Sequence, residues 1–457
     1  MGTIVAISTA MGNGGIGIIR MSGKESFKIL EKIFKPKNKR FDDIKGYNIK
    51  FGYIVNPDTE EIIDEVLVSF FKSPKSYTTE DMCEINSHGG IVVQKMILEQ
   101  CLKSGANIAE PGEFTKRAFL NGRIDLSQAE SVIDLINSRT EKEAKASVNQ
   151  LEGWLSKKIE EIRSYLLDIM SDIEATIDYP EYDIEEVTNT RAIEKLGIIL
   201  EKLDILEKSF ETGKILKEGI NTIIIGKPNA GKSSLLNLIL NEERAIVSDI
   251  AGTTRDTIEE YINLKGIPLK LIDTAGIRET NDKIEEIGVN KSIDLINKAD
   301  LIISIFDNSR ELEKEDYQIL DMIKNKKSII VLNKIDLGKH VLEQKEEILN
   351  LNIPIVKMSA KMGDGIQSLY EKIINIFNMG EVELDNSMVI TNTRHKNQIK
   401  KAKSNIKKAI DTINECLPID IIGIYIKEAL IELGIITGQN VSEDIINEIF
   451  SKFCLGK

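Results

Sequence analysis

The sequence Ile-Ile-Ile-Gly-Lys-Pro-Asn-Ala-Gly-Lys-Ser-Ser, residues 223–234, decides the fold of the central part of this chain. Its three β-branched residues are typical of a buried strand, and the apolar run after residue 234 indicates a helix. Between them, Gly226 and Gly231-Lys232-Ser233 have the Walker A spacing, whose glycines let backbone N–H groups face a polyphosphate at a helix N-terminus. Lys232 would reach the β- and γ-phosphates, and the Ser233 hydroxyl would bind Mg²⁺. We therefore predict a nucleotide-binding α/β domain.

Two downstream motifs indicate that the nucleotide base is guanine. Asn333-Lys334-Ile335-Asp336 follows an apolar run at residues 329–332, which places it at the end of a predicted strand. Asp336 could accept hydrogen bonds from guanine N1–H and the exocyclic amine, and adenine lacks both donors in that arrangement. Ser359-Ala360-Lys361, after a predicted strand at 355–358, supplies a second loop beside the base.

Two further motifs indicate how the γ-phosphate is sensed. Asp273-Thr274-Ala275-Gly276 ends a predicted strand at 269–272, so Asp273 would act on Mg²⁺ through water and the Gly276 N–H would contact the γ-phosphate. The tetrapeptide at 252–255, Gly-Thr-Thr-Arg, lies between the phosphate loop and this strand as a switch segment. With the base motifs in the same order, these sequences predict a GTPase domain.

The predicted hydrolysis machinery differs from that of Ras-like enzymes, which place a glutamine after D-x-x-G to orient the attacking water. Ile277 occupies that position here. Glu285 is a candidate replacement, although composition alone favours a solvated acidic helix start for Asp282, Glu285 and Glu286. Asn229, inside the phosphate loop, could contribute to a monovalent-cation site that takes the place of a catalytic arginine.

The composition is that of a globular protein with several domains. The chain has 457 residues, of which 42% are hydrophobic and 29% charged. No apolar run approaches the roughly 20 residues that cross a bilayer, and no export signal is visible. Four scattered cysteines are typical of reduced thiols in a cytoplasm. The net charge of −13 argues against indiscriminate nucleic-acid binding, so an RNA substrate would need a local basic patch or a partner protein.

The patterns along the chain predict an α/β domain inserted into a helical domain, behind an N-terminal α+β domain. A G-x-G-x-x-G match at 12–17 continues as a strand rather than a helix, which argues against a dinucleotide site. Residues 127–130 are interpreted as a capping box, after which helical spacing runs to 177 with a break near Gly153. Apolar runs at 47–55, 62–71 and 301–306 predict further strands, and a further helix is predicted at 191–212. The predicted domains are 1–118 (N-terminal), 119–212 (helical), 213–380 (GTPase) and 381–457 (helical).

These motifs, with two more stretches, resemble those of the TrmE/MnmE-type tRNA-modification GTPases. The final Phe453-Cys454-Leu455-Gly456-Lys457 is similar to that family's F-C-[IL]-G-K terminus. The stretch at 111–123, PGEFTKRAFLNGR, is also typical of the family, as is Thr-Ile-Val-Ala at 3–6. The resemblance covers essentially the whole chain.

The resemblance implies an N-terminal domain that dimerises and binds 5-formyl- or 5,10-methylene-tetrahydrofolate, through Arg20, Glu84, Arg123 and Lys457. Arg123 stands where the family also uses lysine, which keeps the charge but changes the geometry. It implies K⁺ ligands at Asn229, Ser248, Ile250 and Thr253, and Mg²⁺ ligands at Ser233 and Thr254. It also implies that Glu285 orients water and that Cys454 is a functional thiol, whereas a cysteine near a chain end is usually inert. Motifs and resemblance together predict GTP contacts at Asn229, Ala230, Gly231, Lys232, Ser233, Ser234, Ser248, Asp249, Ile250, Ala251, Gly252, Thr253, Thr254, Asp273, Thr274, Ala275, Gly276, Asn333, Lys334, Asp336, Ser359, Ala360 and Lys361.

The resemblance further implies a function shared with an FAD-containing partner of the GidA/MnmG type. The two proteins, as a heterotetramer, would add an aminomethyl or carboxymethylaminomethyl group to C5 of the wobble uridine of certain tRNAs. Two alternatives remain open: a ribosome-assembly GTPase of the Era or Der kind, which would carry a basic RNA-binding module, and a GTP-switched scaffold, which would need no folate site.

Overall fold

The computed structural model describes residues 2–37, 47–179, 185–242, 260–272, 296–377 and 388–457. They fall into two compact units. The first unit comprises Met1–Ile136, Gln150–Gly197 and Lys401–Lys457, and the second comprises Asn137–Asn149 and Ile198–Lys400. Within the described residues, no helix combines the length and the apolarity that a membrane crossing requires.

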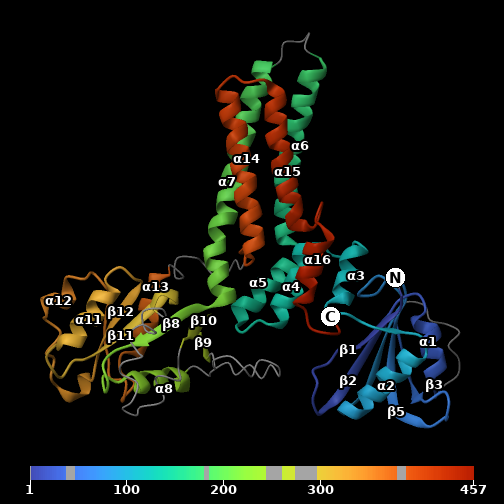
Figure 1. Cartoon of the computed structure of the whole chain (residues 1–457), viewed down its shortest axis with the longest axis horizontal. Coiled ribbons are helices and arrows are strands. Elements are labelled where there is room, and N and C mark those ends of the chain that lie inside the picture. The colour runs from blue at the N-terminus through green and yellow to red at the C-terminus, as the bar shows by residue number, and fades with distance from the viewer. Residues whose placement is uncertain (1, 38–46, 180–184, 243–259, 273–295, 378–387) are drawn as a thin grey trace. The chain divides into compact units, whose positions relative to one another are not determined.

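The N-terminal part of the first unit is a seven-stranded sheet with helices packed on one face (Figure 1). Its strand order is β3-β4-β5-β6-β2-β1-β7. The elements are β1 (Ile4–Ile7), β2 (Gly14–Ser22), α1 (Ser26–Ile33), β3 (Phe34–Pro36), β4 (Tyr47–Val55), β5 (Ile62–Phe71), β6 (Met82–Gly89), α2 (Ile91–Lys103) and β7 (Asn107–Ile108). Alternate residues of β5, Val66, Val68 and Phe70, are buried against α1 and α2, as period-two patterning requires.

The glycine-rich stretch at 12–17 belongs to a hairpin rather than to a dinucleotide site. β2 begins at Gly14 and pairs antiparallel with both β1 and β6. A Cβ on Gly17 would lie 2.5 Å from the Gln94 side chain, so close packing of α2 on the strand explains the glycine there. The predicted strand is confirmed.

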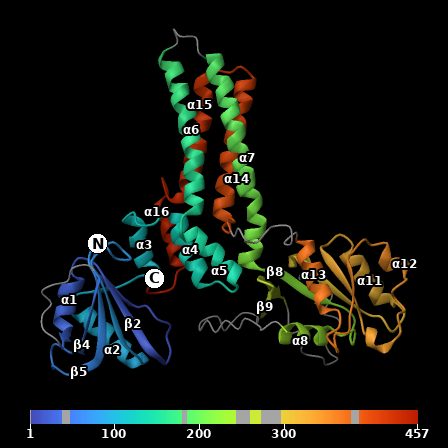
Figure 2. The same cartoon turned by 180° about the vertical axis from the view of Figure 1, so that it is seen from behind.

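Helices make up the rest of the first unit and extend into the second. They are α3 (Glu113–Leu120), α4 (Leu126–Ile136), α5 (Glu141–Leu151), α6 (Trp154–Asp178), α7 (Glu185–Glu218), α14 (Thr393–Asn414), α15 (Ile419–Thr437) and α16 (Glu443–Ser451). α6 and α15 lie side by side along their length (Figure 2). Gly153, in the left-handed region at φ +80°, precedes α6, so the predicted break is confirmed.

The predicted capping box at 127–130 is wrong by two residues. Asp125 Oδ1 accepts a hydrogen bond from the Gln128 N–H at 3.0 Å, and Gln128 Oε1 accepts one from the Asp125 N–H at 3.0 Å. Ser127 instead lies fully buried inside α4. Aspartate and glutamine can form the same reciprocal box as serine and glutamate, so the pattern fitted two neighbouring frames.

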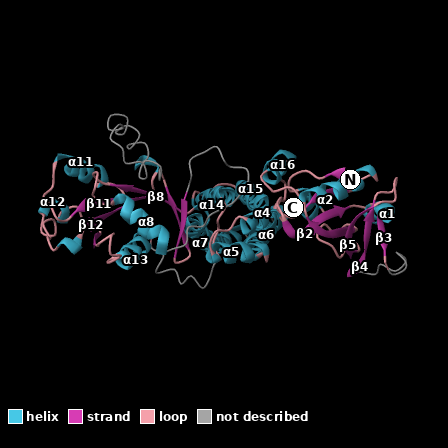
Figure 3. Cartoon of the chain, turned by 90° about the horizontal axis from the view of Figure 1, so that it is seen from below, coloured by secondary structure: helices cyan, strands magenta, loops and turns pink. Residues whose placement is uncertain are grey.

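The second unit contains a six-stranded sheet in the order β13-β12-β11-β8-β10-β9. All neighbouring strands are parallel except β9 and β10. Helices α8 and α13 pack on one face and α11 and α12 on the other (Figure 3). The elements are β8 (Ile220–Ile225), α8 (Lys232–Glu242), β9 (Glu260–Leu264), β10 (Ile267–Leu271), β11 (Leu301–Asp307), α11 (Lys314–Ile323), β12 (Ser328–Asn333), η2 (Ile335–Leu337), α12 (Glu346–Leu349), β13 (Ile355–Lys357) and α13 (Ile366–Ile376).

The topology confirms the predicted α/β domain and adds one strand. Five strands match the predicted apolar runs, whereas the antiparallel edge strand β9 was not predicted. The carboxyl ends of β8, β11, β12 and β13 lie along one edge, because these strands are parallel neighbours. In doubly wound sheets this edge carries the ligand site.

Candidate functional site

The phosphate loop connects β8 to α8 and folds around the Lys232 ammonium. Lys232 Nζ donates hydrogen bonds to the carbonyl oxygens of Gly226 at 2.8 Å and Lys227 at 2.9 Å. Burial lowers the pKa of Lys232 from its usual value. Asn229 and Gly231 both have positive φ, of +63° and +108°, which turns the backbone around the ammonium. The loop thus places a cation and backbone N–H groups where a polyphosphate would bind.

Close packing requires glycine at two loop positions. A Cβ on Gly226 would lie 2.5 Å from the Ile305 carbonyl oxygen, and one on Gly231 would lie 2.1 Å from Asn333 Nδ2. Asn333 is buried, and its Nδ2 donates to the Ala230 carbonyl oxygen at 2.8 Å. The N–H of Ala360 donates to Asn333 Oδ1 at 2.9 Å. One asparagine side chain therefore joins the phosphate loop to both base-side loops.

The base-side loops bring the predicted guanine-recognition residues together. Ser359 Oγ donates to Asp336 Oδ1 at 2.7 Å, and Asp336 itself is exposed to solvent. Lys334, at φ +67°, donates from Nζ to Asp307 Oδ2 at 2.6 Å. Ser359 is fully buried, and Lys361 is exposed. An exposed carboxylate held by a buried hydroxyl fits the proposed contact with guanine N–H donors.

Other predicted nucleotide and cation ligands lie outside the described residues. Two predicted ligands, Ser233 and Ser234, are described by the structure and lie in the first turn of α8. The predicted ligands outside the described residues are Ser248, Asp249, Ile250, Ala251, Gly252, Thr253, Thr254, Asp273, Thr274, Ala275, Gly276 and Glu285. Their assignments remain predictions.

A second cluster lies in the first unit, around the ion pair of Arg20 and Glu84. These residues are direct partners in the register of β2 and β6, and Arg20 Nη2 lies 2.8 Å from Glu84 Oε1. The Arg20 guanidinium lies 5.5 Å from the centre of the Tyr77 ring, and the Arg123 guanidinium 4.5 Å from the same ring. Both distances are in the cation–π range. Tyr77 thus lies against two of the four predicted folate ligands, and Glu84 joins them through Arg20.

The C-terminal tail supplies the fourth ligand by docking on this cluster. The Gly456 carbonyl oxygen accepts hydrogen bonds from Arg20 Nη1 at 3.2 Å and Ser8 Oγ at 3.0 Å, and the Phe114 N–H donates to the Lys457 carbonyl oxygen at 3.2 Å. Burial, followed by the nearby Arg20 charge, lowers the pKa of Lys457, while Glu84 opposes this shift.

Cys454, in the same tail, is exposed, and its carbonyl oxygen accepts a hydrogen bond from Gly112 at 3.4 Å. Four separate parts of the sequence therefore meet at the folate cluster: the segment from Ser8 to Arg20, the segment from Tyr77 to Glu84, the segment from Gly112 to Arg123, and the C-terminal tail. Sequence reasoning missed Tyr77 and Ser8, because neither lies in one of the motifs.

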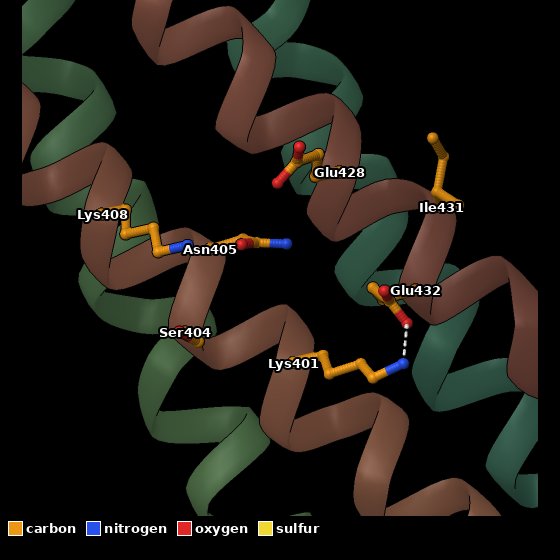
Figure 4. Close-up of a pocket in the computed structure, with 7 residues that line it drawn as sticks. All are labelled: Lys401, Ser404, Asn405, Lys408, Glu428, Ile431 and Glu432. Atoms are coloured by element: carbon orange, nitrogen blue, oxygen red, sulfur yellow. Dashed lines mark ion pairs between the residues drawn. The ribbon is translucent and has the colours of Figure 1, made fainter.

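A cavity of about 430 Å³ opens between α14 and α15 (Figure 4). Lys401 and Lys408 point into it from α14, and Glu428 and Glu432 face them from α15. The Lys401 ammonium lies 3.7 Å from Glu432 Oε2. Opposite charges line the two walls, as expected for a seam between helices, and no predicted site residue lines this cavity.

Comparisons with known proteins agree with this architecture. The family model described as the GTP-binding protein TrmE N-terminus matches residues 3–123, and the MnmE helical domain model matches 126–454. The tRNA modification GTPase MnmE of Acetivibrio thermocellus is 54% identical, over 100% of this chain and 99% of its own length. The protein of the same name from Thermoanaerobacter pseudethanolicus is 49% identical, over 100% and 99%.

Among solved structures, Aquifex aeolicus Era bound to GDP·AlF₄⁻ is 30% identical, with 41% of this chain and 66% of that chain covered and a TM-score of 0.28. The models and the full-length relatives cover the N-terminal, helical and GTPase segments together. The chain belongs to the TrmE/MnmE family of tRNA modification GTPases.

Proposed function

We propose that this protein hydrolyses GTP with Mg²⁺ and K⁺ and, together with an FAD-containing partner, modifies C5 of the wobble uridine of certain tRNAs with a tetrahydrofolate carbon. The observation that carries the proposal is the docking of the C-terminal tail on Arg20, in a chain that also holds a Walker A loop. A GTP-switched scaffold would have no use for such a cluster. An Era- or Der-like protein would not account for a match along the whole chain.

The GTPase half acts by positioning and charge. Lys232 lies where it can exchange its two carbonyl partners for phosphate oxygens. Ser233, in the first turn of α8, would bind Mg²⁺, and Thr254 is the second proposed Mg²⁺ ligand. Asp336 would accept the guanine N–H groups. Bound Mg²⁺ and K⁺ would supply positive charge next to the phosphates, and Glu285 would orient water.

The folate half uses the cluster around Arg20. Glu84 would accept the N–H edge of the pterin, and Arg123 and Lys457 would bind the carboxylates of the glutamate tail. The Tyr77 ring, already stacked against two guanidinium groups, offers a flat apolar surface beside them. Half-burial of Lys457 excludes part of the solvent and strengthens its attraction for an anion. Cys454 is close to this site, and we propose it as a functional thiol.

Three partners complete the proposal: a second copy of this chain, an FAD-containing MnmG/GidA-type protein in a heterotetramer, and tRNA. The face of the N-terminal sheet opposite α1 and α2 exposes Tyr47, Ile49 and Phe51 at alternate positions of β4, with Leu67 of β5 opposite Phe51. Such an apolar stripe supports a homodimer through this sheet. We propose a cytoplasmic location, since the described cysteines are free thiols.

The purified protein tests both halves in one preparation. GTP should be hydrolysed in preference to ATP, and 5-formyl-tetrahydrofolate should bind at equilibrium. The replacement Lys232→Ala should abolish GTP hydrolysis without changing folate affinity. Arg20→Ala should abolish folate binding without changing GTP hydrolysis. A protein that binds only one of the two ligands would refute the combined function.

A further inference from the structure

Residues 307–316 run from the last residue of β11 through the connecting loop into the first turn of α11, and they lie outside every nucleotide-binding motif of the sequence. We call this segment the β11–α11 connection. It nevertheless contacts both halves of the nucleotide site. Asp307, at the end of β11, stands directly opposite Asn333 in the register of β11 and β12. The N–H of Asn308 also donates to the Asn333 carbonyl oxygen at 2.9 Å. The start of the base-recognition loop is therefore anchored to this connection.

The Asp307 carboxylate is largely buried and is the acidic partner of Lys334. Its side chain is 11% exposed, and its Oδ2 accepts a hydrogen bond from Lys334 Nζ at 2.6 Å. Its Oδ1 accepts hydrogen bonds from the Ser309 N–H at 2.9 Å and Ser309 Oγ at 2.6 Å. Burial alone would raise the pKa of Asp307, but the bonds from Lys334 and Ser309 hold it below its usual value. The group is therefore an anion at neutral pH.

Lys334 needs such a partner for a conformational reason. Its φ of +67° is left-handed, a backbone region that is unfavourable for residues with a Cβ. An ion pair with a largely buried carboxylate offsets this cost and fixes the direction of the Lys334 side chain. Asp336, two residues later, depends on the same loop for the position of its carboxylate.

The same connection contacts the phosphate loop more weakly. Lys227 Nζ pairs with Glu313 and with Glu315, the latter at 2.7 Å, at the start of α11. Both glutamates are more than half exposed, and solvent-exposed ion pairs of this kind contribute little to stability. Because the Asp307 carboxylate is largely buried, its ion pair with Lys334 is expected to hold the nucleotide site more strongly than the exposed pairs of Lys227 do.

We propose that Asp307 is a positioning residue for guanine recognition, which acts through Lys334 to hold the Asn333–Asp336 loop in its binding conformation. The inference rests on the proposed GTPase function, because it assumes that this loop binds the base. It predicts that loss of the Asp307 charge weakens nucleotide binding without slowing hydrolysis of bound GTP.

The test compares Asp307→Asn with Asp300→Asn in the full chain. Asp300 lies just before β11, at the opposite end of the strand, where its Oδ2 accepts hydrogen bonds from Asn221 Nδ2 at 2.8 Å and from the Asn221 N–H at 3.1 Å. The control therefore makes the same chemical change next to the other end of the same strand. The readouts are the dissociation rate of a fluorescent GDP analogue, KM, and kcat at saturating GTP.

We expect Asp307→Asn to accelerate GDP dissociation and raise KM by about tenfold, with kcat near wild type, and Asp300→Asn to change none of these. In a Lys334→Ala background, Asp307→Asn should add little, because its effect passes through Lys334. A variant that only unfolds part of the protein would lower kcat and leave KM unchanged.

Equal dissociation rates for Asp307→Asn and Asp300→Asn, or additive effects with Lys334→Ala, would overturn the positioning role while leaving the GTPase function intact. A wild-type protein that fails to bind the GDP analogue would instead refute the GTPase function, and this inference with it.

Discussion

The docked C-terminal tail makes a sharp prediction at Gly456, which has φ +87°. In Gly456→Ala the new Cβ would lie 2.4 Å from the Ile7 carbonyl oxygen and 2.8 Å from Ser8 Cα. Both neighbours are backbone atoms, because Ile7 is the last residue of β1 and Ser8 follows it, so neither atom can rotate away. The left-handed backbone alone costs alanine roughly 1–2 kcal/mol.

Relief of this clash must move the tail and break the two hydrogen bonds to the Gly456 carbonyl oxygen. The bond from Ser8 contributes about 0.5–1.5 kcal/mol, and the charged one from Arg20 about 1.5–3 kcal/mol. The two bonds together contribute about 2–4.5 kcal/mol to the docked tail, and in the alanine variant the docked state carries both the left-handed cost and the backbone clash. Undocking relieves both, so we expect the tail to leave its site and carry Lys457 away from Arg20 and Glu84.

Isothermal titration with 5-formyl-tetrahydrofolate measures the consequence. The affinity of Gly456→Ala should fall by at least about tenfold, while GTP hydrolysis should stay near wild type. Gly105→Ala is the matched control, because Gly105 also has positive φ, at +117°, but has nothing within 4 Å of its added Cβ. Equal folate affinity in the two variants would refute the role of the tail in the folate site.

Three predictions concern the GTPase site. Because Ile277 replaces the water-orienting glutamine and Asn229 lies in the phosphate loop, K⁺ should accelerate hydrolysis far more than Na⁺, and equal initial rates in the two salts would refute the cation site. Glu285→Ala should slow single-turnover hydrolysis by at least about tenfold at unchanged GTP affinity, and an unchanged rate would favour the solvated-helix interpretation. Asp336→Asn should shift the preference from guanine toward xanthine nucleotides in competition binding, since the amide offers a donor where the carboxylate accepted; retained GTP selectivity would contradict this contact.

Local patterns predicted the elements well where one interaction dominates. The apolar runs at 47–55 and 62–71 match β4 and β5 residue for residue, because strand alternation is written in the sequence itself. The edge strand β9 was missed, since an antiparallel edge depends on its neighbour β10 rather than on its own composition. The helix predicted at 191–212 is longer, Glu185–Glu218, because tertiary packing extends helices past weak local signals.

The residues of the nucleotide site could be predicted from local patterns, whereas those of the folate site could not. The phosphate loop and the base loops are continuous motifs, so their residues could be named from the sequence. The pairing of Arg20 with Glu84 follows from strand register, and the docking of Gly456 on both Ser8 and Arg20 spans more than 430 residues of chain. No local pattern encodes such contacts, and only the resemblance to a family suggested them. Tyr77 and Asp307 carried no signal, because their roles depend entirely on their three-dimensional neighbours.

The central claim is that this protein modifies the wobble uridine of tRNA, and nucleoside mass spectrometry of tRNA tests it most directly. The comparison is between a strain that lacks this protein and the same strain complemented with wild type or with Lys232→Ala. We predict that the 5-aminomethyl- or 5-carboxymethylaminomethyluridine family of nucleosides disappears in the deletion strain and returns only with the wild-type protein. An unchanged nucleoside profile in the deletion strain would contradict the claim.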